Sequence, residues 1–564
     1  SLASTKTGNR LFAGSPETGD IVKLTLSTTD RELNRSNTIT GGTSAATGKI
    51  LDVDYNNDVY YVKVTSVANF QNEPVSVGDS SSVVTITSVL GTDNVKTGAV
   101  HWIDQDVNTS FSIKQSIVAP DVNVGGEFGK SVAVSGDGTY LAVGAPGGPN
   151  DSSAGGRGTV FIYKYAKDGS STRYDIHQTL VPTTSQLGAR FGTGVKFAED
   201  GSALIVTSAQ YDNDSTTTDN GRATVYRFKN DAYYEHETLV PQTDDPIEFG
   251  TSVAIDSDGS DVVIGAPLYT GAVSTQGGVF HYSLKTSTLQ GDGSTTAFES
   301  SFVINMSDAV GVFVDNENIP FGNDGSTTSY YTLDSSSTGV TFSTAPAMGS
   351  QITISQYQFV ETLVQRVPSV NQGFGNAVNI DNDTLIVQSK QGDNKLYTTF
   401  DSVATDGSTV LPETTFDGNT TKFNDITVDT GQVSVFTKLN TEFQFVQNLS
   451  TPVTLKSGAN FGSGMAISNL SLYIGAKNND TTFNNEFAGT QNFSNSGQIL
   501  IFNKPTSGLG WNNVIEQPNL VDTQKLKSAF TYNIGSGTVV NFLSIIDPAK
   551  GKLFPQVQES IKYQ

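Results

Sequence analysis

The chain has 564 residues, 36% of them hydrophobic, and a formal net charge of −23. This length exceeds one ordinary hydrophobic core, so several domains or one large repeat architecture are expected. The acidic balance argues against a nucleic-acid partner, because no basic face displaces counterions from phosphates, and the absence of cysteine excludes disulfides and thiolate sites. No apolar run reaches the about 18 residues of a membrane-spanning helix, so we expect no membrane insertion.

The chain opens with a partial copy of a sequence that returns later. Residues 1–16, SLASTKTGNRLFAGSP, align without a gap with residues 252–267. The alignment places Ser1 inside a strand, three positions after a Phe-Gly pair that the chain does not contain. We therefore read residues 1–26 as the first part of a repeat unit and residues 27–97, which interrupt it, as an inserted β module.

A hairpin motif follows and recurs along the chain. In FGKSVAVSGDGTYLAVGAP, residues 128–146, apolar residues alternate with small or polar ones on both sides of a Ser-Gly-Asp-Gly turn, as in two half-buried strands. Residues 249–267, FGTSVAIDSDGSDVVIGAP, match it nearly position for position. Weaker copies start at Phe191, Phe374 and Phe461.

Each hairpin is followed by two more strands, one led by glycine and one leading to a proline, as in GTVFIYKY at 158 and YDIHQTLVP at 174. Units of four strands, repeated this often, predict an all-β protein built as a β-propeller. Six units are countable, and a segment from Lys527 that resembles residues 456–464 would begin a seventh. The expected blades occupy 98–284, 358–390 and 431–543.

The residues that recur at the two ends of the hairpin are predicted to be architectural. Phenylalanine would pack between blades, glycine would let backbones approach closely, and the proline would end the second strand. A ligand-binding role is disfavoured because these residues recur in every unit. The set consists of Phe128, Gly129, Gly144, Ala145, Pro146, Phe191, Gly192, Phe249, Gly250, Gly265, Ala266, Pro267, Phe374, Gly375, Phe461 and Gly462.

This Phe-Gly…Gly-Ala-Pro pattern resembles the FG-GAP repeat of integrin-α-type propellers, which usually have seven blades. Many such repeats carry a calcium loop between the first two strands, and here that loop is shortened. Asp256, Asp258 and Asp261 come closest to it. Calcium takes six or more oxygen ligands, which a short turn does not supply. A structural turn is therefore favoured over a Ca²⁺ site, and no other cofactor is expected.

Further segments interrupt or follow the repeat. Residues 285–357 resemble a small β-sandwich module of tail-fibre and other virion proteins of tailed phages. The 27–97 insert and the C-terminal segment 544–564, read as a linker, resemble parts of structural proteins of contractile-tailed marine cyanophages. A third insertion covers about 391–430.

The sequence offers no catalytic motif, although its many carboxylates leave a glycosidase pair open by inventory alone. The four histidines, at 101, 177, 236 and 281, lie in strands that repeat without histidine elsewhere, so we read each as a tolerated strand residue. Tyr211 and Tyr269 follow the second strand of two neighbouring units. Exposed aromatic rings there would suit a rim surface for sugar binding.

The resemblance to virion proteins and the lack of a catalytic motif favour a structural, non-enzymatic protein of a phage particle, in its tail, baseplate or fibre. Its expected partners are other virion proteins or copies of itself, and a polysaccharide of the host surface. The alternative is an extracellular adhesin or filament subunit of a bacterium. A polysaccharide-degrading enzyme is the least favoured class.

Overall fold

The computed structural model describes residues 1–395 and 426–504, with gaps, and residues 512–513, 531–533 and 539–541 beyond them. The gaps are residues 17–20, 28–36, 55–57, 67, 78–83, 91–96, 106–110, 121–125, 149–155, 169–170, 185, 214–218, 244, 306–309, 316, 320, 323–328, 335–337, 367–370, 392–393, 428–429, 450–457, 469–470, 479–480, 486–488 and 494–496. Several predicted segments lie outside the described residues: most of the 391–430 insertion, most of the segment from Lys527, and the 544–564 linker. One of the two tryptophans of the chain, Trp511, also lies outside them. In the described part of the chain, no helix is long and apolar enough to cross a bilayer.

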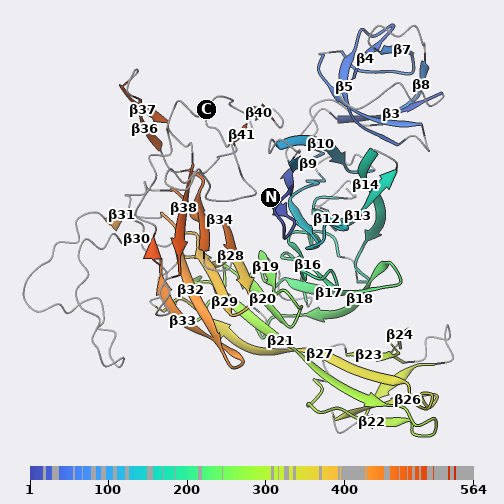
Figure 1. Cartoon of the computed structure of the whole chain (residues 1–564), viewed down its shortest axis with the longest axis vertical. Coiled ribbons are helices and arrows are strands. Elements are labelled where there is room, and N and C mark those ends of the chain that lie inside the picture. The colour runs from blue at the N-terminus through green and yellow to red at the C-terminus, as the bar shows by residue number, and fades with distance from the viewer. Residues whose placement is uncertain are drawn as a thin grey trace, which may run out of the picture. The chain divides into compact units, whose positions relative to one another are not determined.

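The described chain is all-β, and four-stranded antiparallel sheets dominate it (Figure 1). Each pairs its strands in chain order, and in three of them other strands are inserted between the second and the third strand. The sheets are β1 (Leu2–Ser4), β2 (Arg10–Ser15), β9 (Ala99–Gln105) and β10 (Phe111–Val118); β11 (Ser131–Val134), β12 (Tyr140–Ala145), β13 (Thr159–Asp168) and β14 (Ser171–Leu180); β15 (Val195–Phe197), β16 (Ala203–Ser208), β17 (Arg222–Lys229) and β18 (Ala232–Leu239); β28 (Phe374–Asp381), β29 (Thr384–Ser389), β32 (Gln432–Leu439) and β33 (Glu442–Asn448); and β34 (Phe461–Ser468), β35 (Ser471–Ala476), β38 (Gln498–Asn503) and β39 (Asn512–Asn513). This is the strand arrangement of propeller blades.

By contacts, the chain divides into two units. The first comprises residues 1–264, 280–361 and 522–564, and the second residues 265–279 and 362–521. Three of the four-stranded sheets belong to the first unit and two to the second.

The sheet after β18 has six strands. They are β19 (Ser252–Ile255), β20 (Asp261–Ala266), β21 (Gly278–Gln290), β27 (Gln351–Leu363), β23 (Gly311–Val314) and β24 (Glu317–Asn318), in this order. Residues 285 and 357, the predicted limits of the second insert, lie inside β21 and β27. These 13-residue strands run without interruption into the inserted module (Figure 1).

The inserted module adds a three-stranded sheet, β22 (Ala297–Glu299), β26 (Gly339–Phe342) and β25 (Tyr331–Leu333). Residues of both its sheets share one apolar core, which includes Val312, Val340, Phe342, Ile352 and Ile354. We call the part of the chain from β22 to the start of β27 the strand-borne module.

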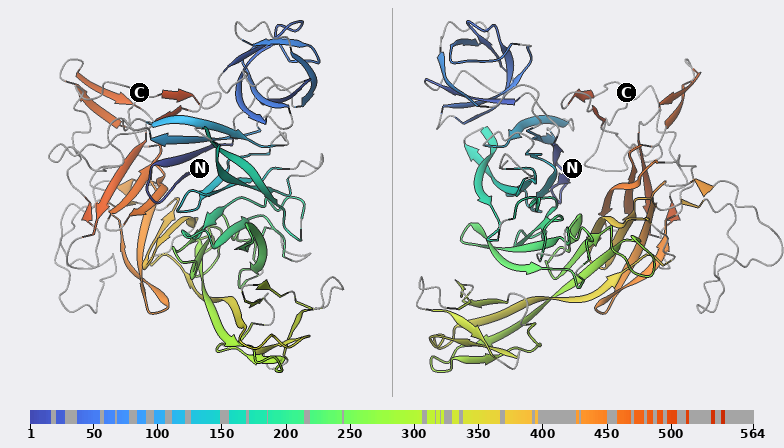
Figure 2. Two further views of the ribbon diagram at one scale, coloured as in Figure 1. Left: turned by 45° about the vertical axis from the view of Figure 1, so that its right-hand side comes forward. Right: turned by 180° about the vertical axis from the view of Figure 1, so that it is seen from behind.

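The other insert is a closed six-stranded barrel (Figure 2). Its strands pair in the order β3 (Ile21–Leu26), β6 (Val59–Val64), β5 (Thr47–Asp54), β4 (Thr38–Gly41), β7 (Pro74–Val77) and β8 (Val84–Leu90). The first of these strands precedes residue 27, where the insert was predicted to begin. Alternate residues of the strands fill the barrel, among them Leu24, Ile39, Tyr60 and Val62. Shorter pairs are β30 (Asn394–Lys395) with β31 (Ile426–Thr427), β36 (Thr481–Asn485) with β37 (Gly489–Phe493), and β40 (Thr531–Asn533) with β41 (Val539–Asn541).

The repeat residues lie where one sheet meets the next. The glycine before the third strand of a sheet forms a parallel bridge with a phenylalanine of the following sheet, which lies at or just before its first strand. The pairs are Gly98–Phe128, Gly158–Phe191, Gly221–Phe249 and Gly277–Phe374. All four phenylalanines, and Phe461, are fully buried. The pair of motifs thus joins consecutive sheets through the backbone and through an aromatic ring.

The Gly-Ala-Pro end meets the Phe-Gly end of the next sheet. A Cβ at Gly144 would lie 2.2 Å from the Gly192 carbonyl oxygen, and one at Gly375 would lie 3.2 Å from the Gly265 Cα. Gly129, Gly192, Gly250, Gly375 and Gly462 all have positive φ, which glycine adopts without strain. Ala145 and Ala266 end β12 and β20 in buried positions, and Pro146 and Pro267 follow them directly.

Candidate functional site

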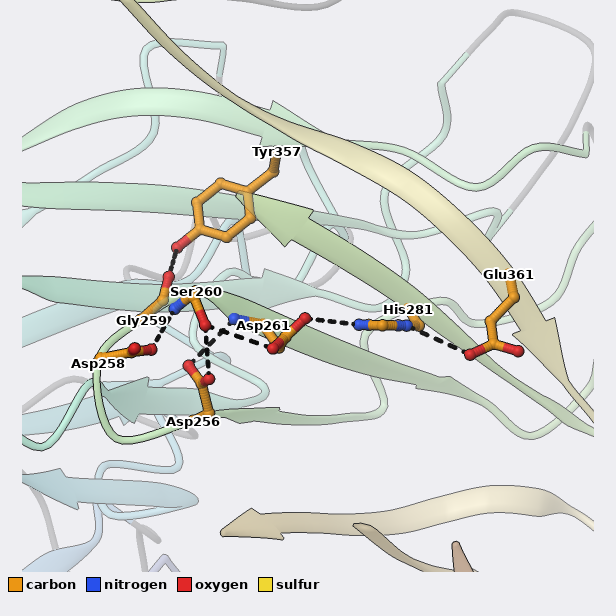
Figure 3. Close-up of polar contacts among 8 residues, drawn as sticks. All are labelled: Asp256, Asp258, Gly259, Ser260, Asp261, His281, Tyr357 and Glu361. Atoms are coloured by element: carbon orange, nitrogen blue, oxygen red, sulfur yellow. Dashed lines mark hydrogen bonds and ion pairs between the residues drawn. The ribbon is translucent and has the colours of Figure 1, made fainter. Parts of the chain in front are cut away.

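The predicted aspartates form the turn between β19 and β20 (Figure 3). Asp256 Oδ1 accepts a hydrogen bond from the Asp261 N–H at 3.0 Å, and its Oδ2 accepts one from Ser260 Oγ at 2.8 Å. Asp258 Oδ1 accepts one from the Ser260 N–H at 2.9 Å. The carboxylates of Asp256 and Asp258 therefore bind groups of their own turn, as acidic turn residues commonly do.

Asp261 points the other way, into the sheet. Its Oδ1 lies 2.8 Å from His281 Nε2, and Glu361 Oε1 lies 3.4 Å from His281 Nδ1 (Figure 3). The His281 side chain is completely buried. Burial lowers the pKa of His281, but the carboxylates of Asp261 and Glu361 accept hydrogen bonds from the imidazole, and together with their negative charges they outweigh burial and raise the pKa. A buried imidazole between two carboxylates is thereby able to hold a proton.

The two turn carboxylates differ in proton affinity. Burial raises the pKa of Asp256 to about 6, although hydrogen bonds from Asp261 and Ser260 oppose this. Burial also acts on Asp258, but hydrogen bonds from Ser260 and Asp256 prevail and lower its pKa. Asp256 is therefore the carboxylate of the turn that takes up a proton first as pH falls.

The arrangement supplies neither an ion cage nor a serine triad. Among the described residues, no group of three or more His, Asp or Glu side chains is placed to hold a metal ion. Ser260 Oγ donates to Asp256 and lies 3.3 Å from Asp261, so its hydroxyl is directed at carboxylates rather than at His281. A serine nucleophile needs its hydroxyl on the imidazole. The network is a buried proton-holding cluster.

The predicted aromatic pair occupies equivalent backbone positions in separate units of the chain. The carbonyl of Tyr211 accepts the Gly221 N–H at 2.9 Å, and that of Tyr269 accepts the Gly277 N–H at 3.0 Å. The Arg222 guanidinium lies 3.6 Å from the centre of the Tyr211 ring and covers one of its faces. The Tyr269 ring lies against Gly278. A sugar could stack only on the uncovered ring faces.

The remaining three histidines have unlike surroundings. His101 Nδ1 lies 2.9 Å from Ser116 Oγ, and burial lowers the pKa of His101 to about 4. His177 Nε2 lies 2.5 Å from the Asp231 carbonyl oxygen. His236 is buried against Gly311 of the strand-borne module. The structure therefore gives each of them a separate environment.

One recurring contact was missed in the sequence. Tyr174, Tyr233 and Tyr357 each donate their hydroxyl to the carbonyl of the glycine in the first turn of their own sheet, at Gly138 (2.5 Å), Gly201 (2.9 Å) and Gly259. All three rings are buried. The available signal was the tyrosine in YDIHQTL, YYEHETL and YQFVETL, which precedes Gln178, Glu237 and Glu361 by four positions. Its partner, which lies 36, 32 and 98 positions upstream in the three copies, was not apparent.

The residue four positions later makes the contact with the next sheet. The Gln115 side chain accepts from the Tyr174 N–H at 2.8 Å and donates to the Tyr174 carbonyl at 3.0 Å. Gln178 makes the same two bonds with Tyr233, at 2.8 Å each. In the third copy Glu237 replaces glutamine, and its carboxylate accepts from the Tyr357 N–H at 3.1 and 3.0 Å. An amide here extends the hydrogen-bonding pattern from one sheet to its neighbour.

Comparisons with known proteins agree with this architecture over part of the chain. Residues 111–163 match the family model described as an FG-GAP repeat. They comprise β10 to the middle of β13 and so contain the Phe128–Pro146 hairpin. The protein is thus an all-β, blade-type protein that contains an FG-GAP repeat.

No curated protein matches the chain. Among solved structures, a crystal structure assigned as a 6-phosphogluconolactonase of Bacteroides fragilis is similar with 9% sequence identity and a TM-score of 0.33, covering 75% of this chain and 91% of that one.

Proposed function

We propose that this chain is a structural, non-enzymatic component of a tailed-phage virion, in its tail, baseplate or fibre. Its blade-type sheets, taken as a propeller of six or seven blades, act as a scaffold that holds inserted modules for contact with other virion proteins, copies of itself or a host-surface polysaccharide. The observation that carries the proposal is the direct, strand-continuous attachment of the strand-borne module.

A flexible linker would leave such a module free to reorient in all directions, whereas paired strands restrict its movement. β21 and β27 extend from the blade-type part of their sheet into the module with no intervening loop. A second contact adds to this, because Lys229 Nζ of β17 lies 2.7 Å from Glu317 Oε2 of β24. This geometry suits a part that presents a surface in a set orientation.

The acidic character is compatible with this role. A net charge of −23 keeps a displayed protein soluble. Divalent cations would bridge it to an acidic polysaccharide.

The decisive experiment is to locate the chain. Antibodies raised against the recombinant protein are applied to density-purified particles and to cells of the source culture, with immunogold electron microscopy as readout. We expect gold at one end of tailed particles, and cryo-EM density there that accommodates the sheets. Label on cell surfaces or filaments, with unlabelled particles, would overturn the virion assignment in favour of the bacterial adhesin, which FG-GAP resemblance also favours.

A further inference from the structure

A histidine of one blade-type sheet is enclosed by the strand-borne module. The His236 side chain, on β18, is only 4% exposed. A Cβ added to Gly311 of β23 would lie 1.6 Å from His236 Cε1, so the imidazole fills the space that any other residue at 311 would need. The Phe313 ring lies 5.6 Å from the imidazole, at 33° to it. The fit depends on a glycine in the module and a flat ring in the sheet.

The surroundings of the His236 side chain favour a neutral imidazole over a protonated one. Its Nε2 is buried without a hydrogen-bond partner in the described part of the chain. The Glu237 carboxylate lies 4.0 Å away, beyond hydrogen-bond distance, and accepts from the Tyr357 N–H. A protonated imidazole there would lose its water without gaining an acceptor.

Other charged and titratable groups around this contact come from four elements. Arg227 of β17 adds a positive charge that further disfavours protonation of His236. The hydroxyls of Tyr331 and Tyr357, on β25 and β27, have raised pKa values because both are buried, and the Glu237 charge adds to this. Lys229 and Glu317 pair with each other at the outer edge. His236 differs from all of these groups, because its ordinary pKa lies near neutrality.

We propose that His236 and Gly311 form an acid-sensitive latch, which holds the strand-borne module against β18 at neutral pH and releases it when His236 is protonated. Burial, with a smaller contribution from Arg227, lowers the pKa of His236 to about 3 in the closed state. In the released state the ring is hydrated and has its ordinary pKa of about 6.5. Because protonation of His236 favours the released state, the equilibrium constant for closure is about 100-fold smaller at pH 4.5 than at pH 8.

The chain has no cysteine, which permits clean spin labelling. Labels are attached at Ile176→Cys on β14 and Met348→Cys in the module, both at exposed positions (47% and 82%). Double electron–electron resonance then measures their separation at pH 8 and 4.5. We expect one narrow distance at pH 8 and an added, broader population at pH 4.5, with an unchanged far-UV circular dichroism spectrum.

Three variants separate the latch from general acid effects. His236→Phe keeps a flat neutral ring and should remain closed at pH 4.5, whereas Gly311→Ala should be open at both values. His177→Phe, on the neighbouring sheet, should respond as the parent does. An unchanged distance in the parent, the same response in His236→Phe, or a change that accompanies loss of circular dichroism would each overturn the latch. The measurement needs only the isolated chain, so its failure is separate from failure of the virion assignment.

Discussion

The strongest test of how consecutive sheets are joined is a comparison of two glycines in the first sheet. Gly98 has φ +87 and forms the bridge with Phe128, and a Cβ there would lie 2.0 Å from the Phe128 carbonyl oxygen. Gly8 has φ +69 in the β1–β2 turn, with nothing within 4 Å of an added Cβ. Alanine at either position costs about 1 kcal/mol for the left-handed backbone. At Gly98 the backbone clash adds about 1–3 kcal/mol.

We therefore expect Gly98→Ala to cost about 3 kcal/mol and Gly8→Ala about 1 kcal/mol. Trp102 reports on this sheet contact, because it is buried with its ring 5.1 Å from Tyr174 of the next sheet. In a Trp511→Phe background, urea unfolding followed by tryptophan fluorescence should give midpoints that differ by about 1 M. Equal midpoints for the two variants would refute the bridge as a determinant of sheet docking.

Three further outcomes are expected. Tyr233→Phe should lower stability by about 1 kcal/mol in urea unfolding, because its hydroxyl bond to Gly201 is lost, while Tyr234→Phe, at a 52% exposed ring, should be neutral. His101 has a folded pKa of about 4, below its unfolded value, so its contribution to stability is complete above about pH 6.5 and falls by about 3 kcal/mol toward pH 4. A His101→Phe variant should lose that part of the pH slope of Trp102 unfolding. His281→Ile should cost about 3–5 kcal/mol in thermal unfolding, because it removes the imidazole from the buried Asp261 and the partly buried Glu361. If the triple variant Asp261→Tyr/His281→Ile/Glu361→Gln lost more stability than the single variant, this reasoning would be contradicted.

The sequence predicted the contacts whose signal is local and repeated. Phe128 and its copies could be recognised as architectural because each stands at a fixed distance from a turn and recurs in register. The tyrosine hydroxyl contact recurs too, but its acceptor is a backbone carbonyl, which no side chain marks. A repeated donor is visible in a sequence, whereas a repeated carbonyl acceptor is not.

The sequence did not predict the limits of the strand-borne module, and the reason is a different one. Residues 285–290, KTSTLQ, are mostly polar and resemble a loop, yet they continue β21. Pairing with β27 outweighs their weak strand signal, as tertiary context commonly does. The His236–Gly311 contact joins residues 75 positions apart and carries no motif.

The cluster around His281 combines three changes of residue type relative to another sheet. In the sheet of β11–β14 the equivalent positions hold Tyr140, Ile162 and Gln178, all without charge. In the module-bearing sheet they hold Asp261, His281 and Glu361, and the histidine contacts both carboxylates. Asp261 without His281 would bury an uncompensated charge, so these two depend on one another. Glu361 is 21% exposed, and Glu237 occupies its position in the sheet of β15–β18 where Ala203 and Val225 stand in place of the aspartate and the histidine. Asp261 and His281 lie on the second and third strands of this sheet, and its third and fourth strands, β21 and β27, extend into the strand-borne module. A change in the protonation of His281 therefore alters contacts of the same strands that extend into the module.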